Sequence, residues 1–474
     1  MRLHELSALE LGRAIRRGEV SIPEVTEWAL QRAGDNAFIT LTGEQAMERA
    51  KDLQARLGEG NSPLYGVPMA LKDNLCTRGI ATTCGSRMLA DFVPPYSATV
   101  VEWMEDAGAV SMGKTNMDEF AMGSTGETSC FGPVPNPWDS RRTTGGSSSG
   151  SAAAVAGGCC WFALGSDTGG SVRLPAAHCG LTAIRPTYGT VSRYGLVAHA
   201  SSMDQVGPLC RDAADCGAVL DVIRRPDRRD AVMLRDGFAP VLEGLDGEVE
   251  GLRLGFPLDW LDEGLDEDIR RAVWSVAEGL RGQGVHLVEL HLPVREDAVA
   301  AYDIISCAEA ASNLARCDGV RFGHRAPGAA NLEQLYTDTR SQGFGAEAKR
   351  RILLGTFWLS ASDCYGRAMA VRGRLKEAFD AVFAQCDALL TPVSSTTAPL
   401  LGEGLGDPGD GYTVPASLVG LPALSMPCGM DRNGLPVGAQ LMGRPWGEQT
   451  ILKLAHAWQR ETDWHRRRPE RGAV

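Results

Sequence analysis

The sequence has no apolar run long enough to cross a membrane as a helix. Its longest apolar stretch, residues 152–165, contains 14 residues, three of them glycines, whereas a membrane-spanning helix needs about 20. The first twenty residues mix acidic and basic side chains with leucines at helical spacing, so they lack the apolar centre of a secretory signal. We therefore predict a soluble, unprocessed protein with no membrane contact.

Two further absences exclude other classes of protein. The 47 lysines and arginines are outnumbered by 59 aspartates and glutamates, giving a net charge of -12, which argues against a chain that binds nucleic acid by itself. The 13 cysteines include no Cys-x-x-Cys pair and no Cys/His cluster at metal-ligand spacing. We therefore predict no disulfide framework and no metal site, in a reduced, cytoplasmic setting.

The N-terminal segment has the pattern of two amphipathic helices. Residues 6–16 and 22–34 carry apolar side chains at helical spacing. Ser21 is placed to cap the second helix, and Pro23 falls in its first turn, where proline is tolerated. We expect both helices to pack on the outside of the core.

Between residues 66 and 184, apolar runs alternate with glycine-rich turns. Residues 98–107 are helix-like, with Ser97 as the expected cap. Three runs are strand-like: 67–72, 109–113 and 160–165. This alternation predicts an α/β fold in which helices cover both faces of a sheet.

The second half of the chain gives fewer signals. Residues 224–250 are polar and charged, which indicates a surface connection, and residues 251–257 have the pattern of a strand. A long amphipathic helix is expected over 266–283, with Asp266 as its cap. Residues 400–411 contain five glycines, and we predict a loop near the functional site there.

Two serine segments flanked by glycines carry the strongest chemical signal. Gly-Gly-Ser-Ser-Ser-Gly-Ser spans 145–151, and Gly-Ser-Asp-Thr-Gly-Gly-Ser-Val-Arg spans 165–173. Upstream, Lys72 ends a short apolar run that, as a strand, would carry it into a dry interior. Two serines and a buried lysine together indicate amide hydrolysis through a serine ester.

These three segments resemble the amidase signature family, and the likeness extends over nearly the whole chain. The resemblance implies a Ser, cis-Ser, Lys triad and the amidase signature fold, a large mixed β-sheet covered by helices on both faces. It also implies a single domain over 1–474, with N-terminal helices at about 1–60 packed on the core and a signature region at about 66–210.

Amide hydrolysis needs a nucleophile and donors for the oxyanion. We assign Ser171 as the nucleophile, because the glycines before it let backbone N–H groups approach a negative oxygen without side-chain obstruction. The oxyanion hole is predicted at the amides that run from Thr168 through Gly169 and Gly170 to Ser171.

The predicted base is Lys72. It must be neutral to accept a proton, so burial has to lower its pKa well below about 10.4. Ser147 is expected to relay the proton between Lys72 and Ser171, and the family resemblance places this serine in a cis peptide. A helix beginning at 152–156 would help to hold the serines rigidly.

Within the family, the chain is similar to the glutamine-hydrolysing A subunits of bacterial tRNA-dependent amidotransferases. The resemblance implies that it frees ammonia from glutamine for converting Glu-tRNA(Gln) to Gln-tRNA(Gln). It implies two partners, the B and C subunits of a heterotrimer; the B subunit holds the misacylated tRNA and uses ATP and Mg, and this chain has no cofactor. The segments that carry this narrower match are 114–124, 186–197, 201–208, 349–356 and 462–465.

Glutamine is a zwitterion, so its recognition needs a cation for the α-carboxylate and an anion for the α-ammonium. By resemblance, Arg351 binds the carboxylate and Asp410 the ammonium, while Tyr302 and Ser124 line the same pocket. The sequence leaves open whether Arg351 or its neighbour Arg350 faces that pocket.

A few positions depart from the family pattern. Ser149 stands where glycine is usual, Gly126 and Thr128 alter the loop after Ser124, and the segment before Asp410 is shorter than usual. None of these changes removes a catalytic group, but each could change the affinity for glutamine.

Three other motifs match by letter and are disfavoured. Residues 108–115 fit the P-loop pattern, but their centre is an apolar, strand-like run. Residues 111–114 spell Ser-x-x-Lys without a companion Lys-Thr-Gly. Residues 146–150 spell Gly-x-Ser-x-Gly around Ser148, but no apolar strand leads into them.

Two alternative functions remain open from the sequence. A free-standing amidase acting on small amides would have no zwitterion for Arg351 and Asp410 to hold. A non-catalytic subunit with a relic site is disfavoured, because Lys72, Ser147 and Ser171 are all present. Whether Asp-tRNA(Asn) is also served, and which surface meets the partners, is not decided by the sequence.

Overall fold

The centre of the molecule is an eleven-stranded mixed β-sheet. The computed structural model describes residues 2–34, 36–60, 62–261, 264–361, 363–403 and 410–470, so the middle of the predicted 400–411 loop lies outside the described residues. A separate two-stranded sheet pairs β4 (Pro135–Asn136) with β5 (Asp139–Thr143). In spatial order, the strands of the large sheet are β1 (Phe38–Leu41), β3 (Val110–Thr115), β2 (Pro68–Lys72), β6 (Phe162–Asp167), β8 (Gln205–Cys210), β7 (Thr182–Arg185), β12 (Ala423–Met430), β13 (Pro436–Gly443), β11 (Ala388–Pro392), β9 (Arg253–Pro257) and β10 (His286–Leu290).

Helices pack on both faces of this sheet. A Cβ added at Gly438 would meet Ala177, whereas one added at Gly443 would meet Ile451. Positions 438 and 443 differ in parity along β13 and therefore face opposite sides of the sheet. The predicted α/β architecture is confirmed. The helices are α1 (Ala8–Arg16), α2 (Ile22–Gln31), α3 (Gly43–Ala55), α4 (Thr99–Asp106), α5 (Ser149–Ala156), α6 (Arg173–Cys179), α7 (Ala213–Ile223), α8 (Glu267–Gly282), α9 (Arg295–Asn313), α10 (Leu332–Gly343), α11 (Ala346–Ser360), α12 (Cys364–Phe383), α13 (Val414–Val419) and α14 (Glu448–Glu461).

Two of the three predicted helix caps are present in the structure. Ser21 caps α2 through a capping box with Glu24, and the side chain of Asp266 caps α8, as predicted. The prediction that Ser97 caps α4 is wrong, because Ala98 is the N-cap residue and the Ser97 hydroxyl instead accepts the N–H of Arg78. That hydrogen bond ties the start of α4 to a neighbouring loop.

The parallel pairing of β2 with β6 sets the position of the functional site. Met69, Ala70 and Leu71 pair with residues 162–164, so the carboxyl ends of the two strands reach the same edge of the sheet. Lys72 ends β2 and Asp167 ends β6. Crevices outside the carboxyl ends of strands are where open α/β sheets bind their ligands.

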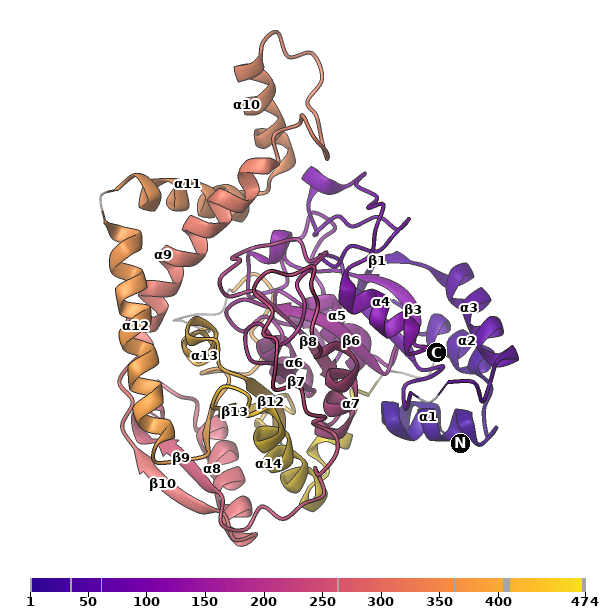
Figure 1. Cartoon of the computed structure of the whole chain (residues 1–474), viewed down its shortest axis with the longest axis vertical. Coiled ribbons are helices and arrows are strands. Elements are labelled where there is room, and N and C mark those ends of the chain that lie inside the picture. Colours follow the sequence, from indigo (N-terminus) through magenta and orange to yellow (C-terminus); the bar gives the residue numbers. More distant parts are fainter. Residues whose placement is uncertain are drawn as a thin grey trace.

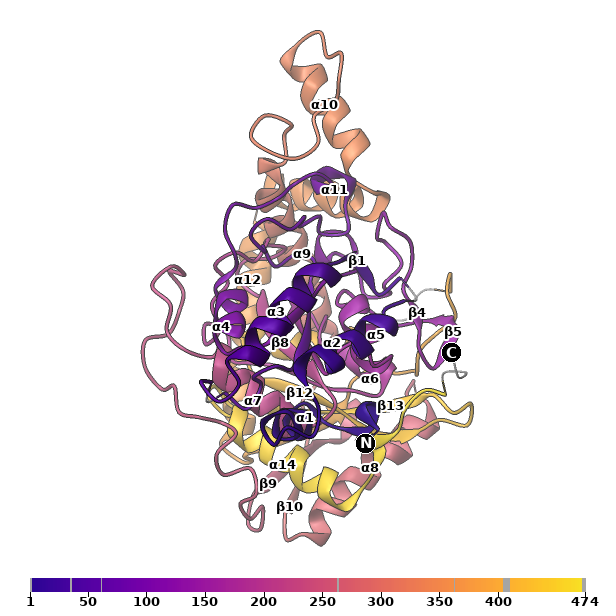
Figure 2. The same cartoon turned by 90° about the vertical axis from the view of Figure 1, so that its right-hand side faces the viewer.

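The helices α9, α11 and α12 form a layer to one side of the sheet, and α10 projects beyond it (Figures 1 and 2). The N-terminus lies on the opposite side, near α1 (Figure 1). Residues 224–250 join α7 to β9 without a helix or strand of their own. Among the described residues, no helix combines the length and apolarity required to span a bilayer.

Candidate active site

The amino group of Lys72 lies in the buried interior at the end of β2. Its Nζ is 2.7 Å from Oγ of Ser147, 2.9 Å from Oγ of Ser148 and 3.3 Å from the carbonyl oxygen of Ser166. The side chains of Lys72, Ser147 and Ser148 are fully buried. The structure thus brings the predicted base and relay into direct contact, and it adds Ser148 as a second hydroxyl on the same amine.

Burial lowers the pKa of Lys72 to about 7, because removal from water penalises the ammonium form. The carboxylates of Asp118, Asp167 and Asp204 act in the opposite direction, but burial outweighs them. A lysine with a pKa near 7 is substantially neutral at physiological pH, which is the state that a general base requires.

The two predicted catalytic serines come from the two glycine-rich segments. The peptide bond between Gly146 and Ser147 is cis. The carbonyl oxygen of Ser171 accepts the N–H of Ser148 at 3.1 Å, which joins the segments. Within the described part of the chain, the Ser171 hydroxyl has no hydrogen-bond partner. The hydroxyls of Ser147 and Ser171 are therefore not hydrogen-bonded to each other.

Residues 168–171, which we call the oxyanion loop, connect β6 to α6. The Thr168 hydroxyl donates to Asp204 at 2.7 Å, which fixes the start of the loop. The N–H groups of Gly169, Gly170 and Ser171 donate to no other described residue. These amides are consequently available to a negative oxygen.

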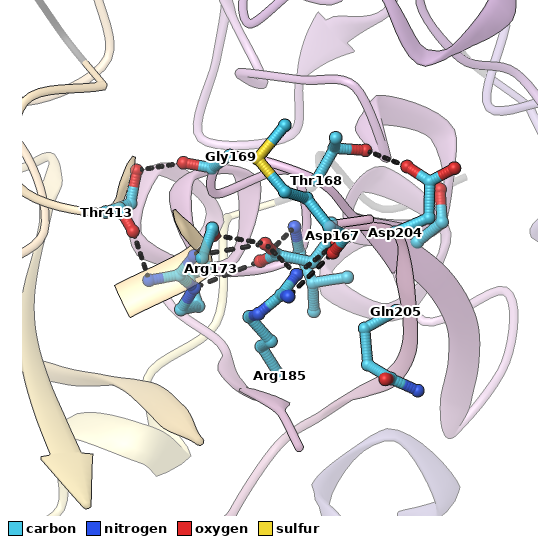
Figure 3. A network of polar contacts seen from close by, with 12 residues as sticks. Asp167, Thr168, Gly169, Arg173, Arg185, Asp204, Gln205 and Thr413 are labelled. Atoms are coloured by element: carbon cyan, nitrogen blue, oxygen red, sulfur yellow. Dashed lines mark hydrogen bonds and ion pairs between the residues drawn. The ribbon is translucent and has the colours of Figure 1, made fainter. Parts of the chain in front are cut away.

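A buried ion-pair network holds both ends of the oxyanion loop (Figure 3). Asp167, before the loop, accepts from Nε and Nη2 of Arg173, after the loop, at 3.0 Å each. Arg185 on β7 also contacts Asp167, at 3.2 Å. Burial acts to raise the pKa of Asp167, but the two guanidinium groups outweigh it and hold that pKa low. Asp167 is therefore a permanent anion that clamps the loop.

Of the two neighbouring arginines on α11, Arg351 faces inward. Its side chain is 14% exposed, whereas that of Arg350 is 55% exposed, and both bond Glu347. Arg351 is therefore the buried member of the pair, and Arg350 is the exposed one.

The other residues predicted to bind glutamine gather around the oxyanion loop. Burial raises the pKa of Asp410 to about 6, against the opposing effects of Arg351 and a hydrogen bond from Ser124. The carbonyl oxygen of Ser124 accepts the N–H of Gly146, the residue before the relay serine. Tyr302 on α9 packs on the loop so closely that a Cβ at Gly169 would lie 2.6 Å from its hydroxyl. The predicted residues therefore share one region of the structure.

Two of the positions that depart from the family pattern, Gly126 and Thr128, bind a neighbouring carboxylate. Both Gly126 and Thr128 donate backbone N–H groups to the Asp118 carboxylate, at 3.0 and 3.1 Å.

Residues 110–115 of the P-loop match form β3, and Lys114 is buried with its Nζ 3.2 Å from the carboxylate of Asp73. Because Lys114 forms this buried ion pair, its amino group is not exposed to bind a phosphate, as a P-loop lysine would be.

Sequence reasoning missed several residues of this region. Asp167 and Arg173 lie on either side of the glycines of the 165–173 segment, so their opposite charges could have predicted the ion pair. Arg185 lies outside this segment, and its neighbours in the sequence do not indicate a role. His199 is buried, and neither of its ring nitrogens has a hydrogen-bond partner among the described residues. Burial, with the charges of Arg351 and Lys72, lowers its pKa well below the usual value. It is therefore a neutral imidazole beside the site.

Known proteins resemble this chain over nearly its whole length. The sequence model of the family described as Amidase matches residues 24–452. The curated A subunit of the Moorella thermoacetica glutamyl-tRNA(Gln) amidotransferase is 49% identical over 100% of both chains. The crystal structure of the A subunit of the Thermotoga maritima glutamyl-tRNA(Gln) amidotransferase is 36% identical, with a TM-score of 0.78 over 96% of this chain and 95% of that one. The peptide amidase of Stenotrophomonas maltophilia is 30% identical, with a TM-score of 0.84 over 98% of each chain.

Proposed function

The chain belongs to the amidase family, and on this premise we propose that it is the glutamine-hydrolysing subunit of a tRNA-dependent amidotransferase. The observation that carries the proposal is the inward-facing cation of Arg351 together with the carboxyl group of Asp410, beside the oxyanion loop. These charges suit the two charged ends of glutamine. The full-length similarity to proteins named as A subunits of such enzymes supports the same assignment.

In the proposed mechanism, the Ser171 hydroxyl attacks the side-chain amide carbon of glutamine. Its proton passes to Ser147, which gives its own proton to neutral Lys72 across the 2.7 Å contact. The amide oxygen becomes an oxyanion, which the N–H groups of the oxyanion loop, Thr168, Gly169 and Gly170 among them, stabilise. Because these donors are fixed before the reaction, they need no reorganisation when the charge develops.

Collapse of this intermediate breaks the carbon–nitrogen bond. Lys72 returns the proton through Ser147 to the leaving nitrogen, so ammonia departs and a glutamyl ester remains on Ser171. Water then attacks the ester, with Ser147 and Lys72 again taking the proton, and glutamate is released. The balance is one glutamine and one water converted into one glutamate and one ammonia.

Ammonia is the product that the proposed assembly consumes. We propose that it passes to the B subunit, which holds the misacylated tRNA and uses ATP and Mg, while the small C subunit joins the two. The tRNA acceptor is Glu-tRNA(Gln), and this chain has no cofactor of its own. Such an assembly would work in the cytoplasm, where aminoacyl-tRNA is made.

The direct test is ammonia release from L-glutamine, measured with the chain alone and then with the B and C subunits and Glu-tRNA(Gln). Release that appears or rises sharply with partners and tRNA supports the proposal. Rapid turnover of neutral amides by the chain alone, with glutamine ignored, would identify a free-standing amidase instead. The structural similarity to a peptide amidase is the observation that favours a free-standing amidase as the second candidate function.

The pH dependence of glutamine hydrolysis should follow Lys72. Because the pKa of this group is lowered to about 7, the base is protonated and inactive below that pH. We expect kcat/KM to fall about tenfold per pH unit below 7 and to level off above it. The measurement is kcat/KM between pH 5.5 and 9; a flat profile across pH 7 would show that Lys72 is not the base.

Arg351→Gln should raise the KM for glutamine by about 10- to 100-fold, because a hydrogen-bonded charge at the α-carboxylate is lost. Turnover of a neutral amide such as propionamide should stay unchanged. The matched control is Arg350→Gln, which removes a mostly exposed arginine from the same carboxylate, Glu347, and should leave both substrates unaffected. Equal losses on the two substrates would contradict the assignment of Arg351 to the glutamine carboxylate.

A further inference from the structure

Two side chains from distant segments enclose the glycines of the oxyanion loop. The hydroxyl of Thr413 donates to the carbonyl oxygen of Gly169 at 2.6 Å (Figure 3). A Cβ at Gly170 would lie 2.2 Å from that hydroxyl oxygen, and a Cβ at Gly169 would lie 2.6 Å from the hydroxyl of Tyr302. Glycine is therefore needed here to admit Thr413 and Tyr302, as well as to expose the amides.

The hydrogen bond from Thr413 fixes the orientation of one peptide plane. In a trans peptide the C=O and N–H point in opposite directions, and the Gly169–Gly170 bond is trans. With the Gly169 carbonyl turned toward Thr413, the N–H of Gly170 points away from it. Gly170 has a φ of +141°, a conformation that glycine adopts readily. Because glycine backbone dihedrals are permissive, the peptide plane between Gly169 and Gly170 could rotate if the hydrogen bond from Thr413 were absent.

Thr413 is itself held in place. Its carbonyl oxygen accepts from Nη1 of Arg173 at 2.9 Å, and its side chain is fully buried. Its N–H donates to the carbonyl oxygen of Asp410 at 3.1 Å. The same Arg173 binds Asp167, so one guanidinium links the start of the oxyanion loop to the Thr413 backbone (Figure 3).

We propose that Thr413 is a positioning residue of the oxyanion hole, which turns the Gly170 N–H toward the reacting carbonyl oxygen. The turn from Asp410 to Thr413 then connects glutamine recognition with the oxyanion donor. When the α-ammonium of glutamine binds Asp410, it holds this turn, and with it the hydroxyl that orients the Gly169–Gly170 peptide. The glutamine part of the inference rests on the proposed function, whereas the positioning part needs only amide hydrolysis.

The test is Thr413→Val, which keeps the shape of the side chain and removes the donor. We expect kcat for glutamine, measured in the complex with the partner subunits, to fall about 10- to 100-fold, because one oxyanion donor loses its orientation. KM should stay within about twofold, since the substrate-binding charges are intact. Thr413→Ser restores the hydroxyl and should recover kcat to within about threefold of wild type.

The matched control is Thr190→Val. Thr190 is also fully buried and donates its hydroxyl to a backbone carbonyl oxygen, that of Thr187, at 2.7 Å. Among the described residues, this turn has no hydrogen bond to the oxyanion loop. Thr190→Val should keep the wild-type kcat. An unchanged kcat in Thr413→Val, a loss that lies in KM alone, no recovery in Thr413→Ser, or an equal loss in Thr190→Val would each overturn the proposal.

Propionamide separates this inference from the proposed function. If the wild-type protein hydrolyses propionamide but not glutamine, the proposed function fails. A 10- to 100-fold lower kcat of Thr413→Val on propionamide would then still support the positioning role, and an unchanged kcat would overturn it. A wild-type protein that hydrolyses neither amide overturns both.

Discussion

Ser171→Ala is expected to abolish glutamine hydrolysis, with kcat reduced by about 10⁴-fold or more, because the hydroxyl proposed to form the glutamyl ester is lost. Transamidation by the assembled complex should survive when ammonium chloride replaces glutamine, since added ammonia bypasses this active site. The hydroxyl of Ser171 is bonded to no other described residue, so its removal breaks no internal contact of the fold. The measurement is Gln-tRNA(Gln) formation with either nitrogen source.

A neighbouring serine supplies the control for this variant. Ser149 is fully buried and its hydroxyl has no partner among the described residues, so Ser149→Ala should keep glutaminase activity within about threefold of wild type. If Ser171→Ala also lost the ammonium-dependent reaction while remaining assembled with its partners, the separation of roles between the subunits would be wrong. Retained glutaminase activity in Ser171→Ala would remove Ser171 as the nucleophile.

The elements of the fold were predictable where their signals are local. Ser21 and Asp266 mark helix starts through side-chain hydrogen bonds within one turn, and Pro23 lies in the first turn of α2. Ser97 met the same rule and was misread, because a longer-range bond to Arg78 competes for its hydroxyl. The spatial order of the strands has no such local signal. For example, β6 pairs with β2, which precedes it by about ninety residues, and this depends on tertiary packing.

The residues of the site also fall into two groups: those in local sequence motifs, which could be predicted, and those brought in by tertiary packing, which could not. Lys72, Ser147 and Ser171 sit in short motifs whose glycines and flanking apolar run are visible in the sequence. Thr413 contacts a residue 244 positions away, and a threonine in a turn carries no mark of such a partner. Arg185 also reaches Asp167 only because β7 pairs with β8, and β8 pairs with β6. Positioning residues of this kind are recognised only when the segments are seen together.

Lys72→Met should lower kcat/KM for glutamine by about 10³- to 10⁴-fold at pH 8, because the group that takes and returns the proton is lost. Methionine is flexible, apolar and unbranched like the lysine stem, so the fold should be kept. The rise in activity through pH 7 should vanish with the lysine, since no group with that pKa would then control the relay. The measurement is kcat/KM against pH for the wild type and the variant.

The second buried lysine distinguishes catalysis from stability. Lys114 is as buried as Lys72, but its Nζ pairs with the Asp73 carboxylate at 3.2 Å. Lys114→Met leaves that carboxylate buried without its cation, which typically costs about 3–5 kcal/mol, so the melting temperature should fall while the pH profile of the folded enzyme persists. Lys72 bonds two hydroxyls and a carbonyl oxygen, and no carboxylate is left unpaired when it is replaced. If Lys72→Met instead lost stability and kept the wild-type pH profile, Lys72 would not be the base. Its role would then be structural, limited to its hydrogen bonds with Ser147 and Ser148.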